Sequence, residues 1–243
     1  MLEFINKFIH GGFETGDFSY GVTHMLAIAF VIISIIVFSV LLKGKDEKYI
    51  NSKMKIIAFI TLTIYLFRKL YDVKSVGNIV EAYWPFYLCN INTIVLALYI
   101  IFSWKKGKDF FIVTGLIGGI FTFLIPDGIF TDKYLTLGIL DSIMSHYLIV
   151  VVPFVLLITK AHILKFKNIW IVYAGLILTI INSEFIQKIL FNKEKDYLFF
   201  DSDIPFTING VPQFIIISLL AIVLVFLVYY IDHLYINRRL KNS

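Results

Sequence analysis

Residues 20–42 read YGVTHMLAIAFVIISIIVFSVLL, an apolar run without Lys, Arg, Asp or Glu. Crossing the hydrocarbon core of a bilayer, about 30 Å thick, takes about 20 predominantly apolar residues of helix. This run therefore predicts a transmembrane helix. The rest of the chain is similar, since 59% of its residues are hydrophobic, 16% are charged and the mean hydropathy is +0.85. A soluble domain cannot bury that much apolar surface, so we expect a polytopic membrane protein.

Six further stretches are long and apolar enough to predict spans. We therefore predict an all-α fold, with residues 1–243 forming a single domain that is a bundle of seven transmembrane helices. Gly115, Gly118 and Gly119 suit close packing of the fourth helix, and the following Pro-Asp-Gly turn ends it. The predicted helices cover residues 20–42, 54–71, 83–104, 110–125, 142–159, 168–185 and 211–231.

The charges of the loops predict the orientation. Of the 22 Lys and Arg residues, 14 lie in loops 43–55, 104–109 and 160–167 and in the tail after Ile231, where only 4 of the 17 acidic residues lie. Positively charged loops stay in the cytoplasm, so we predict a multi-pass protein of the cell membrane with an external N-terminus and a cytoplasmic C-terminus. The basic charge then faces anionic lipid headgroups and not nucleic acid. The charged N-terminal region predicts no cleaved signal peptide.

Polar side chains within the predicted spans gather in the external third of the bundle, whereas the cytoplasmic halves are almost purely apolar. Such groups are costly in a bilayer and are therefore functional candidates. A transport path would place polar residues through the whole thickness, so the one-sided cluster favours an enzyme pocket on the extracytoplasmic side. The cluster comprises His24, Arg68, Lys69, Asp72, Cys89, Asn90, Asn92, Thr122, Asp127, Asp141, His146, Asn182 and Glu184.

Cys89 and His146 are the predicted catalytic pair. Cys89 follows Pro85 by a turn, so we place it in the first turn of the third helix, where the helix dipole favours a thiolate. Amide donors on Asn90 and Asn92, or free backbone N–H groups, could hold an oxyanion. His146 is the candidate base. The alternatives are that Cys89 is a small apolar filler and that His146 is a core histidine bonded to a helix carbonyl.

The remaining candidates have supporting roles. Asp127 is the first choice for the group that orients His146, although it could simply cap the turn. His24 could bind phosphate or transfer a proton, and Arg68 could hold a substrate phosphate or, like Lys69, extend to the headgroups. The predicted substrate-binding set is His24, Arg68, Asn90, Asn92, Asn182 and Glu184, the last being the second choice for orienting the histidine or a residue facing the headgroups.

Three strings carry a resemblance to a known family. They are Trp84–Asn90 (WPFYLCN), Gly118–Asp127 (GGIFTFLIPD) and Ser145–Tyr147 (SHY). In type and spacing they resemble motifs of the YwaF-like integral membrane proteins, which are related to eukaryotic cysteine-dependent phospholipid acyltransferases. The resemblance implies a thiol nucleophile at the cysteine and a histidine partner. The chain departs from the pattern in lacking a threonine directly before Pro126 and in having Asp196 where the family often has Asn.

The longest predicted external segment, residues 187–210, mixes charged and aromatic residues. It is either an interfacial loop with an aromatic anchor or a lid over a lipid-facing cavity.

Three functions compete. The first is a phospholipid acyltransferase or transacylase with an acyl-thioester intermediate, which would act on phospholipid and lysophospholipid without a cofactor, a metal or a protein partner. The second is a seven-helix lipid hydrolase that holds zinc with its histidines and carboxylates. The third is a non-enzymatic transporter or receptor for a lipid or small molecule.

Overall fold

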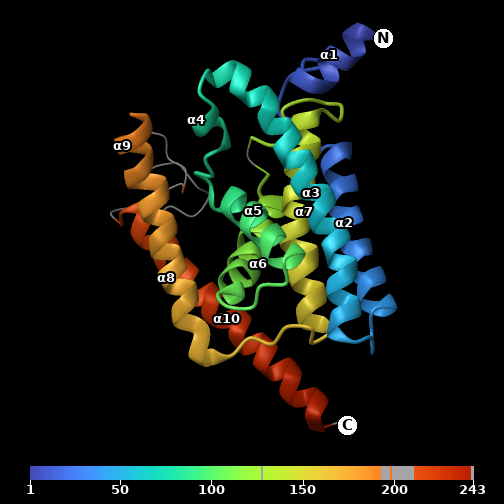
Figure 1. The fold of residues 1–243 in the computed structure, drawn as a ribbon, viewed down its shortest axis with the longest axis vertical. Coiled ribbons are helices and arrows are strands. Elements are labelled where there is room, and N and C mark those ends of the chain that lie inside the picture. Colours follow the sequence, from blue (N-terminus) through green and yellow to red (C-terminus); the bar gives the residue numbers. More distant parts are fainter. Residues whose placement is uncertain (127, 193–197, 199–210, 242–243) are drawn as a thin grey trace.

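The computed structural model describes residues 1–126, 128–192, 198 and 211–241, and within this part of the chain the fold is all-α (Figure 1). Several helices begin at a side-chain cap, because Asp46, Asn78 and Thr136 each accept a hydrogen bond from backbone N–H groups of the following turn. The helices are α1 (Leu2–His10), α2 (Val22–Leu41), α3 (Glu47–Val76), α4 (Ile79–Tyr83), α5 (Leu88–Ile101), α6 (Lys108–Leu124), α7 (Leu137–Ile158), α8 (Ile169–Ile180), α9 (Gln187–Phe191) and α10 (Gln213–Lys241).

The helix α7 lies at the centre of the bundle, and α2, α3, α5 and α6 pack around it (Figure 1). Its second half is almost wholly buried. Close approach to α6 depends on two of the glycines noted in the sequence. A Cβ at Gly115 would lie 3.0 Å from the Ile149 carbonyl oxygen, and one at Gly119 would lie 2.4 Å from Val150 Cγ2. The predicted role of these glycines in close packing is therefore confirmed at these two positions.

The helices α8 and α10 attach to the outside of this bundle through α6. Gly175 of α8 lies directly against the Phe110 ring of α6, and the Tyr173 hydroxyl donates to the Ile222 carbonyl of α10 over 3.3 Å. A short 3₁₀ turn, Phe166–Asn168, leads into α8, and a π-helical segment, Ile181–Ile186, joins α8 to α9. These elements form one continuous rod over residues 166–191.

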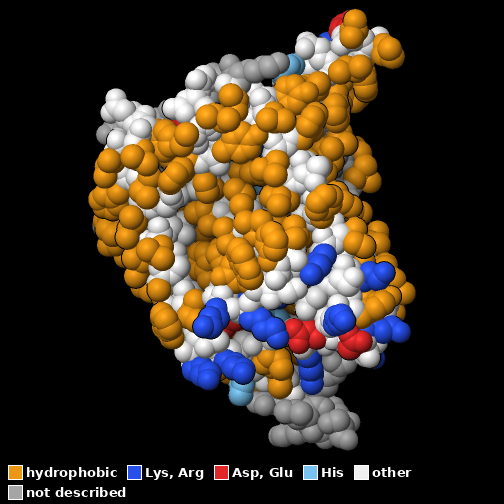
Figure 2. All heavy atoms as spheres, viewed as in Figure 1, with side chains coloured by type: hydrophobic (Ala, Val, Ile, Leu, Met, Phe, Trp, Pro, Cys, Tyr) orange, Lys and Arg blue, Asp and Glu red, His pale blue; other side chains and the backbone are white. Residues whose placement is uncertain are grey.

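The surface is that of a membrane protein. A broad belt of apolar side chains covers the face in Figure 2, and Lys and Arg gather toward one end of the molecule. Among the residues that the structure describes, four helical segments are long and apolar enough to cross a membrane, and most of their side chains are not buried within the fold, except in the central α7. These four are Val22–Leu41, Leu137–Ile158, Phe166–Phe191 and Gln213–Ile236.

The other three predicted spans differ from this description. The 14 residues of α5 and the 17 of α6 rise only about 21 and 26 Å at 1.5 Å per residue, less than the hydrocarbon thickness. The helix α3 has 30 residues, but Lys55, Arg68 and Lys69 lie within its apolar part. A multi-pass membrane protein follows from the four long helices, and the number of seven spans stays a prediction.

At the end of the molecule where Lys and Arg gather, the buried carboxylate of Asp109 hydrogen-bonds to three other segments. Asp109, in the first turn of α6, accepts hydrogen bonds from His162 Nε2 (2.8 Å), Asn168 Nδ2 (3.2 Å) and the Tyr229 hydroxyl (3.2 Å). Its side chain therefore joins α6, the loop after α7, the start of α8, and α10.

Candidate active site

Cys89 lies in the first turn of α5, as predicted, because that helix begins at Leu88 with Tyr87 as its N-cap. The thiol packs against the hydrophobic core and donates a hydrogen bond to the Asn90 side-chain oxygen, 3.8 Å away. N–H groups in a first helical turn have no intrahelical partner, and the helix dipole is positive there. The first-turn N–H groups and the helix dipole therefore contribute favourably to a negative charge on sulfur, or on a substrate oxygen beside it.

Hydrogen bonds from the π-helical segment Ile181–Ile186 hold the segment between α4 and α5 in place. The Trp84 indole N–H donates to Asn182 Oδ1 (2.9 Å), and Asn182 Nδ2 donates to the Pro85 carbonyl (2.8 Å). The buried Ser183 hydroxyl donates to the Phe86 carbonyl. These bonds satisfy backbone carbonyls that the break in the helix leaves free. Asn182, predicted to bind substrate, thus has both amide groups engaged in positioning the chain that enters α5.

A hydrogen bond sets the register between α5 and α6. The two helices are antiparallel neighbours, since the end of α5 bonds to the loop before α6 (Figure 1). Near their middle, the Thr114 hydroxyl shares its proton between the Phe110 carbonyl of its own helix (2.6 Å) and Asn92 Oδ1 of α5 (3.2 Å). Residues three or four apart share a helix face, so Cys89 and Gly118 both lie about one turn beyond this contact, at the same level. A Cβ at Gly118 would meet nothing within 4 Å, so there is open space beside it.

His146 lies about one turn further along α6, beside Thr122 and Phe123. Its Nδ1 is 2.7 Å from the Ser142 carbonyl, which can only accept, so Nδ1 carries the proton and Nε2 holds a lone pair. No described residue hydrogen-bonds Nε2. The ring borders a crevice with no room for a water molecule, and no hydrogen bond joins His146 to Cys89. The crevice is lined by Thr122, Phe123, Ile129, Phe130, Ser142, Ile143 and His146.

His24, predicted to bind substrate, has a hydrogen-bond partner at each ring nitrogen. Its ring is fully buried, accepts the Tyr20 N–H at Nδ1 (3.0 Å) and donates from Nε2 to the Phe123 carbonyl (2.9 Å). It also packs against the Phe130 ring, with centroids 4.6 Å apart. Both nitrogens are engaged, so His24 connects α2 to the end of α6. Within the described ranges, no three His, Cys, Asp or Glu side chains cluster as metal ligands.

Charged side chains of α3 gather beside α7. Arg68 and Lys69 both form ion pairs with Asp72, the Lys69 Nζ at 3.2 Å from Oδ2. The Arg68 guanidinium lies over Gly138 of α7, where a Cβ would be 3.6 Å from Nε. Asp141 of α7 lies within electrostatic range of both cations. Arg68, predicted to bind phosphate, is therefore only half-buried and is paired within the protein.

Three further predictions concern the outer end of the bundle. Asp127, predicted to orient His146, lies outside the described residues, as does most of the loop 187–210 that could act as a lid. Glu184 belongs to the π-helical segment and is half-buried.

An N-terminal strap, residues 12–18, is a feature that the sequence did not reveal. It runs antiparallel to residues 130–133, with Phe18 N–H donating to the Phe130 carbonyl over 2.9 Å. Asp132, 3% exposed, holds the strap by accepting from Gly12 N and Phe13 N (both 2.9 Å) and Glu14 N (3.2 Å), besides its own neighbour Tyr134 N (3.1 Å). The strap groups that it binds are backbone N–H groups about 120 residues away. Backbone groups are the same in every residue, so the sequence contains no pattern that predicts this contact.

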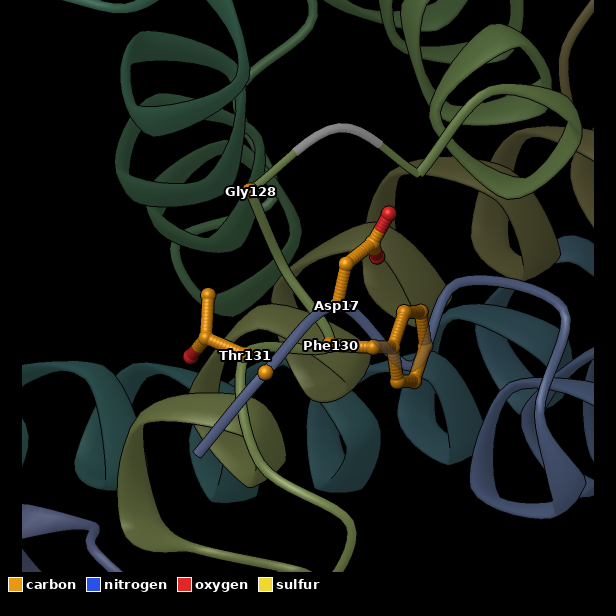
Figure 3. A pocket seen from close by; sticks show the side chains of 5 residues that line it. Asp17, Gly128, Phe130 and Thr131 are labelled. Carbon is orange, nitrogen blue, oxygen red and sulfur yellow. The ribbon is translucent and has the colours of Figure 1, made fainter. Parts of the chain in front are cut away.

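The strap forms one wall of a shallow outer cavity of about 330 Å³ (Figure 3). Gly16 and Asp17 of the strap face Gly128, Phe130 and Thr131 of the loop after α6. Hydrogen bonds from the Ser19 side chain and N–H lower the pKa of Asp17, so this carboxyl is ionised at neutral pH. Phe130 lines both this cavity and the His146 crevice, so its ring separates the two.

The apolar surface and the long helices define a multi-pass helical membrane protein, with a thiol and an imidazole in its interior. The model of the TMEM164 family matches residues 19–232, so the chain belongs to the TMEM164 family. Comparisons with curated proteins and with solved structures give no significant match. The finer relation, to the YwaF-like proteins and their acyltransferase relatives, stays a prediction from the motifs.

Proposed function

We propose that the chain is a membrane-embedded phospholipid acyltransferase or transacylase in which Cys89 carries the acyl group and His146 transfers the protons. The proposal includes the predicted topology of seven spans, with the N-terminus and the site on the extracytoplasmic side. Phospholipid and lysophospholipid are the proposed donor and acceptor, and the pair of side chains needs no cofactor.

The observation that carries the proposal is that Cys89 and His146 lie beside the same side of α6, the one that carries Gly118 and Thr122. Thr114 meets α5, whereas Gly115 and Gly119 meet α7. At 100° per residue, Gly118 and Thr122 lie between these two faces. The open space at Gly118 is level with Cys89, and Thr122 lines the His146 crevice.

The protonation of His146 suits this role. Since Nδ1–H is held by the Ser142 carbonyl, Nε2 is the atom that can accept a proton. The same bond fixes the ring orientation, as a carboxylate does in other nucleophile–base pairs. The narrow crevice beside the base must open, or be filled by substrate, before a proton can pass from the thiol to His146. Apo sites commonly have such loose geometry.

The reaction then proceeds in two balanced steps. Cys89 sulfur, its proton taken by His146 Nε2, attacks the ester carbonyl of a phospholipid. The C–O bond breaks, and the lysophospholipid leaves with the proton from His146, which creates a thioester. A hydroxyl of a second lysophospholipid gives its proton to His146 and attacks the thioester carbonyl. The C–S bond breaks, and the thiolate recovers the proton. Water in place of the hydroxyl would give hydrolysis.

Intact mass spectrometry of the purified protein, incubated with phosphatidylcholine of defined chains, tests this. We expect an added acyl mass on Cys89, absent from Cys89→Ala and strongly slowed in His146→Ala. His233→Ala is the matched histidine control, because that ring is exposed near the end of α10. An unmodified wild-type protein whose lipid turnover equals that of Cys89→Ala would refute the proposal. Turnover that depends on stoichiometric zinc would favour the hydrolase, and binding without turnover would favour a transporter or receptor.

A further inference from the structure

Three buried polar atoms around the start of α5 have no hydrogen-bond partner in the part of the chain that the structure describes. They are the Tyr65 hydroxyl, Asn92 Nδ2 and the Thr93 hydroxyl. The three side chains are 1%, 1% and 0% exposed. A buried polar group without a partner costs about 1–3 kcal/mol, so three in one region call for a ligand or an ordered water.

Two of these atoms share a helix face with Cys89, and the third belongs to α3, which packs against α5. Asn92 and Thr93 follow Cys89 by three and four residues, so they lie one turn along on the buried face of α5. Tyr65 comes from α3, one turn after Thr61, whose hydroxyl donates to the Met144 carbonyl of α7. The Cys89 thiol lies within electrostatic range of the Tyr65 hydroxyl. The three groups therefore approach the thiol from two helices.

The chemistry of the three groups defines what they can bind. Asn92 Oδ1 shares the Thr114 hydroxyl proton with the Phe110 carbonyl, and the NH₂ group of Asn92 remains as a donor. The hydroxyls of Tyr65 and Thr93 can also donate. A cluster of free donors beside a nucleophile fits an oxygen that only accepts and that gains negative charge as the thiol attacks.

We propose that Tyr65 and Thr93, together with Asn92, bind the carbonyl oxygen of the acyl ester and stabilise the oxyanion that forms on it. This inference rests on the proposed function, and it assigns the oxyanion site to α3 and α5 together. Asn90 accepts from the thiol and is not among the three groups without a partner.

The test measures the rate of acyl transfer to Cys89 by intact mass, together with the thermal unfolding midpoint. Tyr65→Phe and Thr93→Val each remove a donor with little change of shape. We expect each to slow acylation by about 10²–10³-fold, the usual effect of losing one oxyanion donor. Both should leave the midpoint unchanged or higher, because an unpartnered polar atom is removed. Thr93→Ser keeps the hydroxyl and should retain most of the rate.

Thr179→Val is the matched control, since it removes a buried hydroxyl of α8 that bonds only to the Gly175 carbonyl of its own helix. It should acylate at the wild-type rate. If Tyr65→Phe and Thr93→Val match the wild-type rate while the wild type is acylated, the oxyanion assignment is wrong and the proposed function stands. The same holds if they lower only the midpoint, because the groups would then hold structural water. A wild-type protein that never gains the acyl mass overturns both proposals.

Discussion

Gly119→Ala is expected to destabilise the protein by forcing α6 away from α7. The added Cβ would lie 2.4 Å from Val150 Cγ2 and 3.1 Å from Ile149 Cγ1. Favourable carbon–carbon contacts begin at about 3.5 Å, so atoms of α7 must shift by about 1 Å. Valine in a helix has essentially one rotamer, and Val150 is 2% exposed, so the side chain cannot swing away.

The magnitude follows from two opposing effects. Inserting a methyl group into a packed core costs about 1–3 kcal/mol. Replacing a helical glycine with alanine gains about 1 kcal/mol in helix propensity. The difference is about 0–2 kcal/mol, and because the contact to Val150 is as short as 2.4 Å, we expect the free energy of unfolding to fall by close to 2 kcal/mol in Gly119→Ala. Gly118→Ala, one residue away, has nothing within 4 Å of its Cβ, so only the propensity gain applies.

The assay is the thermal unfolding midpoint of the purified proteins in one detergent, read by retention on size exclusion after heating. Gly119→Ala should unfold at a lower temperature than the wild type, and Gly118→Ala at the same or a higher one. Equal midpoints for the two variants would refute the packing argument. Acyl transfer gives a second reading, because Gly118→Ala fills space beside Cys89 and should slow acylation without loss of stability.

The strap and the α6–α8 contact give further predictions. Asp132→Ala should speed amide hydrogen exchange and proteolysis at residues 12–18, since the strap loses three hydrogen bonds to a carboxylate, whereas unchanged protection there would contradict this. In the wild type, burial opposes ionisation of the Asp132 carboxyl, but the four backbone N–H bonds outweigh it and lower its pKa below the usual value. Their stabilisation is fully present above about pH 4 and is lost as the pH falls through that lowered pKa, so the strap should stay protected at pH 5–7 and open below about pH 4. Gly175→Ala would place a Cβ 2.3 Å from the Phe110 ring, so its midpoint should fall at least as far as that of Gly119→Ala, and wild-type stability would show that α8 is not fixed against α6.

Hydropathy located the helices but not their breaks. The predicted span 83–104 counted Trp84, Pro85 and Phe86 as apolar, whereas the structure has them in a non-helical connection, so α5 begins only at Leu88. An apolar side chain does not by itself dictate a helical backbone. The carbonyls freed by the break are satisfied by Asn182 and Ser183, about 97 residues away, and only tertiary packing can supply such partners.

Residue type and depth identified candidate groups but not their partners. Cys89 was correctly placed in a first turn because Pro85 marks where a helix cannot continue backward. His24, by contrast, is engaged at both nitrogens by backbone atoms, which a sequence cannot foretell. The sequence also gave no reason to single out Tyr65 or Thr93, because a hydroxyl in a membrane helix usually bonds to its own helix.

The shortness of α5 has a consequence for how lipid reaches the protein. Its last residue, Ile101, is followed closely by Lys105 and Lys106, which fix that end near one headgroup layer. About 21 Å of helix then stops about 9 Å short of the opposite boundary of a hydrocarbon layer about 30 Å deep. With α5 spanning as predicted, the thiol in its first turn would lie at the depth of the acyl chains, so fatty chains would not need to leave the bilayer to react.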